Sequence, residues 1–175
     1  NVDFYETQNR FSTLLPEHGY ILDFGCGSGR DTKYFLEQGF YVDATDGSEE
    51  MCHIASNYTG IQVRRLLFEE LDENKKYDGI WACSSILHLP KNELKVVFMK
   101  MLKALKEDGI IYTSFKYGDF EGERNGRYFT DFTEKTFEEF VDEIDNLQLK
   151  EEWITGDVRP GRGEEKWLNV ILQKN

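Results

Sequence analysis

Short apolar runs alternate with amphipathic segments along the chain, and this alternation predicts a sheet flanked by helices. A short apolar run between turn residues is typical of a buried strand. Apolar residues spaced by three or four positions are typical of a helix that buries one face. The pattern predicts strands over 20–24, 40–45, 61–66, 78–83, 110–115, 149–155 and 166–173. It predicts helices over 4–15, 31–38, a segment capped by Ser48, a long segment from 91 or 92 to 105, and a segment capped by Thr133.

The order of these elements predicts one α/β domain over residues 1–175. Alternating helices and strands with short connections favour a doubly wound, mostly parallel sheet. No helix separates the last two predicted strands, so we expect a C-terminal antiparallel hairpin in a seven-stranded sheet. The chain has three prolines and no Ser/Gly-rich linker that would mark a second domain.

A glycine-rich loop follows the first predicted strand. An apolar run leads to Asp23, and glycines then alternate at Gly25, Gly27 and Gly29 before the next helix. Because glycine has no Cβ, such a loop can turn sharply and bring its backbone close to a ligand at the helix N-terminus. The spacing is G-x-G-x-G, whereas dinucleotide-binding folds use G-x-G-x-x-G. We therefore expect a nucleotide cradle for a different cofactor.

An acidic residue ends the second predicted strand. Asp46, followed by Gly47, lies about 20 residues beyond the first glycine, where nucleotide-binding βαβ units place the carboxylate that binds ribose. The same carboxylate could cap the next helix, and the two roles are compatible.

These residues resemble the motifs of class I S-adenosylmethionine-dependent methyltransferases, in which an acid precedes G-x-G-x-G and a second acid ends strand two. Residues 77–90 and 102–116 resemble later motifs of that family, in the same order. The resemblance implies that fold, with S-adenosylmethionine as the cofactor. It extends loosely to small bacterial methyltransferases linked to tellurite detoxification.

The resemblance also implies roles for individual residues. The glycine loop would face the aminoacyl part of the cofactor, and Asp23 would approach its ammonium group or else tie down the loop. Leu67 and Phe68 would adjoin the adenine, unless Phe68 belongs to the core. The predicted cofactor-binding residues are Asp23, Gly25, Cys26, Gly27, Gly29, Asp46, Gly47, Leu67, Phe68 and Cys83.

His88 is the catalytic candidate. It lies just beyond the fourth predicted strand, where members of the family that the chain resembles place a histidine that faces the substrate and sometimes acts as a base. A structural role is the alternative. Methyl transfer needs a base only if the acceptor arrives protonated, because alignment and desolvation can supply most of the acceleration.

Basic residues gather in two segments that should meet at the carboxyl edge of the sheet. One segment follows the fifth predicted strand, and the other joins the last two strands. Guanidinium groups suit carboxylates and phosphates. The alternative is that these are surface charges paired with neighbouring acids. The predicted substrate-binding residues are Lys116, Arg127, Tyr128, Arg159 and Arg162.

Composition narrows the classes of function. A formal net charge of −12 disfavours binding to nucleic-acid phosphates. Three cysteines without C-x-x-C spacing disfavour both a metal site and a disulfide framework, which indicates a reducing, cytoplasmic compartment. No apolar run approaches the roughly 20 residues that span a membrane, and no signal peptide is visible. We expect residues 1–15 to be the remnant of an N-terminal helical cap.

The sequence therefore predicts methyl transfer from S-adenosylmethionine to a small-molecule acceptor, with an anionic acceptor as the narrower expectation. Two alternatives stay open. The domain could bind the cofactor without turnover, or it could be a nucleotide-binding oxidoreductase, which would need the glycine spacing that is missing here. The sequence does not indicate an oligomeric state.

Overall fold

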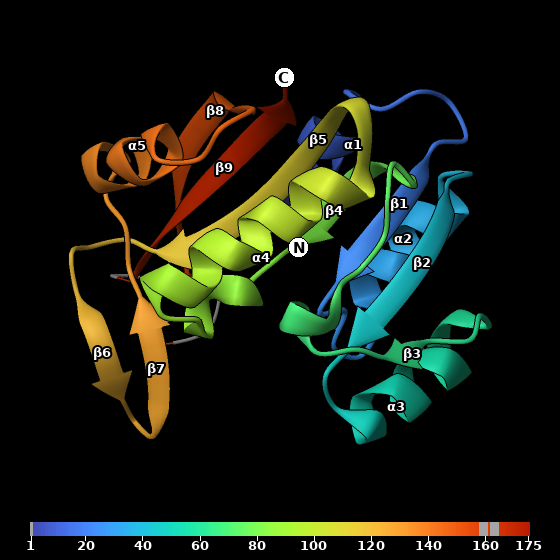
Figure 1. The fold of residues 1–175 in the computed structure, drawn as a ribbon. Coiled ribbons are helices and arrows are strands. Elements are labelled where there is room, and N and C mark those ends of the chain that lie inside the picture. The colour runs from blue at the N-terminus through green and yellow to red at the C-terminus, as the bar shows by residue number, and fades with distance from the viewer. Residues whose placement is uncertain (1, 158–160, 162–164) are drawn as a thin grey trace.

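The computed structural model describes residues 2–157, 161 and 165–175. These residues contain a seven-stranded sheet with helices on both of its faces (Figure 1). The helices are α1 (Val2–Ser12), α2 (Arg30–Glu37), α3 (Glu49–Thr59), α4 (Lys91–Ala104) and α5 (Glu134–Asp142), with short 3-10 turns η1 (Phe68–Glu70) and η2 (Ile86–His88). The strands are β1 (Tyr20–Phe24), β2 (Tyr41–Asp46), β3 (Arg64–Arg65), β4 (Tyr77–Ala82), β5 (Leu105–Lys116), β6 (Glu121–Arg124), β7 (Arg127–Thr130), β8 (Leu147–Gly156) and β9 (Lys166–Lys174). None of the described helices is long and apolar enough to cross a membrane.

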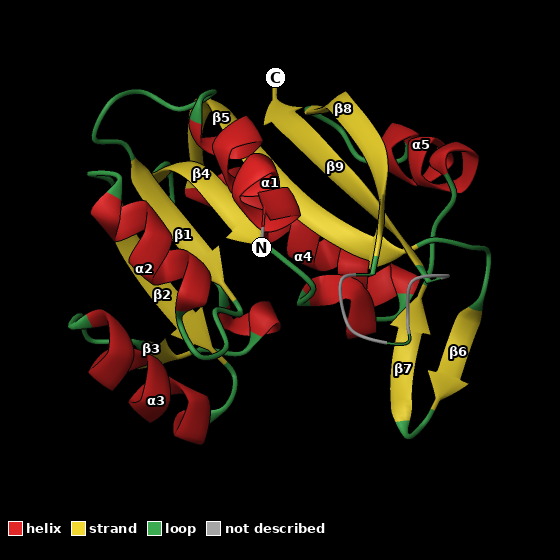
Figure 2. Ribbon diagram, turned by 180° about the vertical axis from the view of Figure 1, so that it is seen from behind, coloured by secondary structure: helices red, strands yellow, loops and turns green. Residues whose placement is uncertain are grey.

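The strand order is β3-β2-β1-β4-β5-β9-β8. Strand β9 runs antiparallel to β5 and β8, and the other neighbouring strands are parallel. Helices α1, α2 and α3 lie on one face of the sheet, and α4 and α5 lie on the other (Figure 2). The structure thus confirms the predicted doubly wound sheet and its C-terminal hairpin.

Several predicted elements have different boundaries in the structure. Strand β3 is shorter than predicted, because the N–H groups of Ile61 and Val63 donate to side chains of α3 rather than to β2. Helix α4 ends before Leu105, which pairs with Tyr77 of β4 and begins β5. Strand β5 therefore begins before the predicted strand over 110–115, and it contains an irregularity at Asp108, which has a φ of 63°.

A two-stranded hairpin, β6–β7, follows β5 in a segment for which no strands were predicted (Figure 1). Its turn is Asn125-Gly126, and both residues have positive φ, 51° and 78°. Asn-Gly with positive φ at both positions is the signature of a type I′ hairpin turn, so this dipeptide was the available signal. The strands escaped the apolar pattern because they are short and largely polar, with Arg124 opposite Arg127.

Aromatic side chains fill the space between α1, α2 and the sheet. Trp81 of β4 stacks on Tyr112 of β5 with ring centroids 4.2 Å apart. Phe11 of α1 and Phe35 of α2 pack against Trp81 at 5.3 and 5.2 Å. All four side chains are buried, and this burial holds α1 against the central strands. That residues 1–15 are the remnant of a longer cap stays a prediction, as does the extent of the domain over 1–175.

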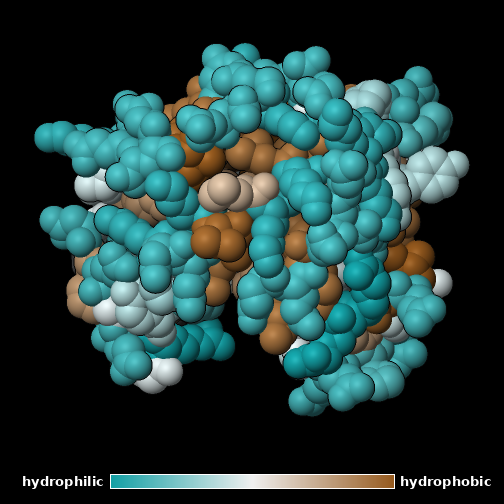
Figure 3. Space-filling view, viewed as in Figure 1, coloured by the Kyte–Doolittle hydropathy of each residue, from teal (hydrophilic) through white to brown (hydrophobic). Residues whose placement is uncertain are grey.

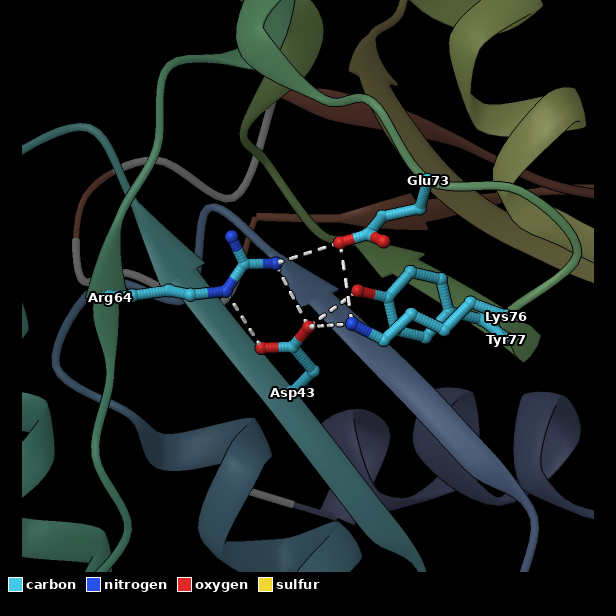
Figure 4. A network of polar contacts seen from close by, with 5 residues as sticks. All are labelled: Asp43, Arg64, Glu73, Lys76 and Tyr77. Atoms are coloured by element: carbon cyan, nitrogen blue, oxygen red, sulfur yellow. Dashed lines mark hydrogen bonds and ion pairs between the residues drawn. The ribbon is translucent and has the colours of Figure 1, made fainter.

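A polar network ties β2 to β3 and β4 (Figure 4). The two carboxylate oxygens of Asp43 in β2 accept hydrogen bonds from Arg64 of β3 at 3.2 and 3.0 Å, and the carboxylate also accepts one from the hydroxyl of Tyr77 in β4. Lys76 lies 3.8 Å from the same carboxylate, and Glu73 pairs with both Arg64 and Lys76. The network therefore fixes β2, the strand that ends in a predicted cofactor-binding residue.

Candidate active site

The glycine loop bends directly after β1. The N–H groups of Gly25 and Cys26 both donate to the carbonyl of Thr45 in β2, at 3.0 and 2.8 Å. Gly25 has a φ of 83°, and a Cβ there would lie 2.6 Å from the Cβ of Ser85. Gly27 has a φ of 57°, and apart from Gly27 and its two chain neighbours no described residue has an atom within 4 Å of its Cβ position. The loop therefore presses against the end of β4 at one glycine and leaves open space at the next, as a backbone cradle requires.

Asp46 adjoins this open space. Its Oδ2 accepts the N–H of Gly27 at 2.9 Å, and its Oδ1 accepts the N–H of Ser48 at 2.9 Å. A carboxylate has about four lone-pair positions, so each oxygen retains capacity for a second donor. Asp46 thus braces the loop and the start of α3 while keeping acceptor sites for the predicted ribose contact.

The residues predicted to adjoin the adenine lie next to Gly47. A Cβ at this glycine would lie 3.3 Å from Cδ2 of Leu67. The Leu67 side chain is exposed, but its N–H already donates to Oε1 of Glu70 at 2.8 Å. Phe68 packs edge-on against Phe24 with ring centroids 4.8 Å apart and contacts the core. Leu67 therefore offers an apolar surface here, and Phe68 supports it from the interior.

Two buried carboxyl groups lie between β1 and the start of α2. Asp23 accepts from Oγ1 of Thr32 at 2.6 Å, and burial together with the nearby charge of Asp31 raises the pKa of Asp23. Asp31 accepts from Nε2 of Gln8 at 2.6 Å and from Nε1 of Trp81 at 2.9 Å. Asp23 therefore ties β1 to α2, and its contact with a cofactor ammonium group stays a prediction. Asp31 and Gln8 gave no sequence signal because their partners are distant along the chain.

The predicted cofactor-binding residues Gly29, Cys26 and Cys83 offer no reactive side chain. Gly29 is the N-cap of α2. Burial raises the pKa of the Cys26 thiol, and burial followed by the charge of Asp31 raises the pKa of Cys83 to about 12. Both thiols therefore stay protonated at neutral pH and are poor nucleophiles.

A cavity of about 750 Å³ opens at the carboxyl ends of β4 and β5. In the space-filling view this edge of the molecule is indented between the hairpin side and the α3 side (Figure 3). The predicted site residues that line the cavity are Cys83, His88, Lys116 and Arg127.

Tyr128 points away from Arg127, the other predicted substrate-binding residue of the hairpin, and its role in substrate binding stays a prediction. It is absent from the cavity lining among the described residues, and its hydroxyl donates to Glu121 at 2.7 Å. Successive strand residues point to opposite faces, so Arg127 and Phe129 reach the cavity and Tyr128 does not. The predicted residues Arg159 and Arg162 lie outside the described residues.

Basic side chains form the cavity wall beside the hairpin. Nζ of Lys116 lies 3.9 Å from Oε2 of Glu165. Arg124, which also lines the cavity, donates to both carboxylate oxygens of Asp131 at 2.8 and 3.0 Å. Arg127 forms no ion pair with the described residues. The wall therefore carries positive charge that local acids only partly balance.

His88 lines the same cavity with a defined tautomer. Its Nδ1 lies 2.9 Å from the backbone carbonyl of Tyr128. A carbonyl can only accept, so Nδ1 carries the proton and Nε2 keeps its lone pair in the neutral ring. Burial lowers the pKa of His88, the hydrogen bond to Tyr128 opposes this shift, and the charges of Arg127 and Lys116 lower the pKa further. The net shift is downward, so His88 is mainly neutral at neutral pH.

The sequence matches known proteins over a large part of the chain. Residues 21–109 match a family described as a methyltransferase domain. The putative methyltransferase YqeM of Bacillus subtilis (strain 168) is 33% identical over 116 residues, which cover 60% of this chain and 47% of that protein. The chain thus spans about half the length of that relative. An uncharacterized methyltransferase of Staphylococcus carnosus (strain TM300) is 24% identical over 160 residues, 85% of this chain and 77% of that protein.

A solved structure with a similar fold contains two ligands. It is the 1,6-didemethyltoxoflavin-N1-methyltransferase of Burkholderia thailandensis with bound 1,6-didemethyltoxoflavin and S-adenosylhomocysteine. Its TM-score is 0.81 at 25% identity, and the match covers 97% of this chain and 77% of that chain.

Proposed function

The chain belongs to the family of class I S-adenosylmethionine-dependent methyltransferases, and from this premise we propose that it transfers a methyl group to a small-molecule acceptor. The observation that carries the proposal is the contact between the glycine loop and the end of β4. Gly25 packs against Ser85, and the neighbouring residues Cys83 and Ser84 line the cavity that also contains His88. A cofactor cradle and an acceptor cavity thus meet at one edge of the sheet, where α/β folds bind their ligands.

The residues at this edge fit S-adenosylmethionine, which supplies an activated methyl group when it is bound. Asp46 would accept hydrogen bonds from the ribose hydroxyls, and the open backbone at Gly27 would admit the cofactor. Leu67 would pack on the adenine, and the backbone at Cys83 would adjoin the methionine part. Gly25, Cys26, Gly29 and Gly47 would shape this cradle rather than react.

The acceptor would occupy the cavity beside the hairpin. His88 would take a proton from an acceptor that arrives protonated, because its Nε2 forms no hydrogen bond with the described residues. Lys116 and Arg127 would favour a small acceptor with an anionic group. The relative from Burkholderia thailandensis binds a small molecule as well, which supports an acceptor of this size class.

Titration calorimetry tests the cofactor assignment. S-adenosylmethionine and S-adenosylhomocysteine are expected to bind, and NAD is expected not to bind, because the loop lacks the dinucleotide spacing. Binding of NAD with no response to either sulfur nucleoside would contradict the proposal. Binding of both nucleosides without formation of S-adenosylhomocysteine in a screen of acceptors would support a cofactor-binding module without turnover.

Proton NMR tests the state of His88 without knowledge of the acceptor. The pKa of the His88 ring is expected to lie below 6.5, the ordinary value for histidine. Arg127→Gln removes a nearby positive charge and should raise this pKa. Lys135→Gln, an exposed change on α5 outside the cavity lining, should leave it unchanged. The spectrum of His88→Gln assigns the resonance, and an unshifted pKa in Arg127→Gln would place the arginine too far away to act on the base.

A further inference from the structure

The β6–β7 hairpin sets two like charges against each other at its tip. Arg124 and Arg127 are directly opposed across the strands, an arrangement that costs stability. Asp131 pairs with Arg124, whose Nε is buried without a hydrogen-bond partner among the described residues. Arg127 pairs with no acid among the described residues, and both arginines line the cavity. An unfavourable pair at this place indicates a use for the charge.

A third cation reaches the same wall from β5. Nζ of Lys116 lies 4.9 Å from the ring centroid of Phe129 and 6.0 Å from that of Trp167. The rings hold this ammonium group beside the cavity and supply little that could neutralise it. Of the acids that line the described cavity, Glu165 is the one that pairs with Lys116. In a chain of net charge −12, this wall is a local attractor for anions.

The apolar part of the cavity is mostly aromatic. Tyr112, Phe129 and Trp167 line it, and Leu87 is the aliphatic side chain beside them in the described lining. The hydroxyl of Tyr112 donates to Oδ1 of Asn169, which fixes the orientation of its ring. Flat side chains held in fixed orientations favour a flat ligand, because ring contacts add to the energy of burial.

We propose that the acceptor is an aromatic compound with an anionic group such as a carboxylate, and that Arg127 recognises this group. The inference rests on the proposed function and narrows its substrate class. Arg127 offers a planar fork that can bind a carboxylate with two hydrogen bonds. Lys116 adds a second positive charge, and Phe129 and Trp167 would pack against the aromatic ring of the acceptor. Arg124 is a positioning residue, since Asp131 holds its guanidinium group near Phe120 and Phe129 at 4.7 and 4.6 Å.

Calorimetry on the full chain saturated with S-adenosylhomocysteine tests this inference. The probes are benzoate, salicylate and nicotinate, each compared with its amide, and cyclohexanecarboxylate as the saturated acid. At least one aromatic acid should bind about tenfold or more tightly than its amide, as expected for a charge-assisted pair of hydrogen bonds. It should also bind more tightly than the saturated acid.

Variants locate the anion contact. Arg127→Gln should abolish the preference for acid over amide, whereas Lys135→Gln removes one exposed charge on α5 and should preserve it. Three results would overturn the inference. The aromatic acids could bind no more tightly than their amides, they could bind no more tightly than the saturated acid, or none of them could bind. A titration with S-adenosylhomocysteine, done first, distinguishes the proposed function from the proposed substrate class. If S-adenosylhomocysteine does not bind, the proposed function is contradicted. If it binds but the aromatic acids do not, only the substrate class is contradicted.

Discussion

The variant Asp43→Ala is expected to lose about 1–3 kcal/mol of unfolding free energy, the usual cost of leaving a buried hydrogen-bonding group without its partner. The Asp43 side chain is only 12% exposed and binds Arg64 and Tyr77 from two other strands. Without it, the guanidinium group and the hydroxyl lose their acceptor in a partly dry environment. Urea denaturation of the two proteins measures the difference.

An exposed ion pair supplies the matched control. Asp72 pairs with Lys103 at 2.8 Å, but the Asp72 side chain is 84% exposed. Exposed pairs contribute little, so Asp72→Ala should unfold at nearly the urea concentration of the wild type. Equal losses in the two variants would mean that the network in Figure 4 is no more than surface charge.

The effect of Asp43 should depend on pH in one direction. Burial alone would raise the pKa of Asp43, but the hydrogen bonds from Arg64 and Tyr77 outweigh it, so the pKa lies below the ordinary value of 3.8. A lowered folded-state pKa contributes stability that is complete above the unfolded value and is lost as the pH falls through the folded one. The difference between wild type and Asp43→Ala should therefore be constant near neutral pH and should shrink below pH 3.8. A difference that grows in acid would reverse the sign of the assigned shift.

The parts of the fold that could be predicted are those with a strong local pattern. Strands β1 and β4 are apolar runs because helices cover both of their faces. The glycine loop was visible because positive φ and close approach at Gly25 require glycine. Thr133 and Ser48 were correctly identified as caps, and both accept a backbone N–H in the structure.

The parts that escaped prediction depend on contacts between distant segments. The buried bonds from Gln8 and Trp81 to Asp31 join α1, β4 and α2, and no local pattern marks them. The orientation of Tyr128 could not be predicted, because the pairing of β6 with β7, which decides where its side chain points, was not recognised. The positions of Lys116 and Arg127 at one cavity followed from topology alone, since β5 and the segment after it both lie at the carboxyl edge.

Asp46→Ala is expected to weaken the binding of S-adenosylhomocysteine at least about tenfold, because each charge-assisted hydrogen bond to the ribose is worth roughly 1.5–3 kcal/mol. The carboxylate holds Gly27 and Ser48 through one oxygen each and keeps capacity for two hydroxyl donors. Calorimetry at one pH and salt concentration measures the change. The affinity of Asp46→Asn for S-adenosylhomocysteine should lie between those of the wild type and Asp46→Ala, since asparagine keeps one acceptor oxygen and loses the charge.

Ser48→Ala separates ribose binding from the bracing of α3. The Ser48 hydroxyl caps this helix by accepting the N–H of Met51 at 3.2 Å, and it makes no hydrogen bond to Asp46 within the described residues. Its loss should cost about 1 kcal/mol of stability and leave the affinity for S-adenosylhomocysteine unchanged. If Ser48→Ala weakens binding as much as Asp46→Ala, the carboxylate acts through the helix. If Asp46→Ala binds as tightly as the wild type, Asp46 is a structural brace and the ribose is held elsewhere.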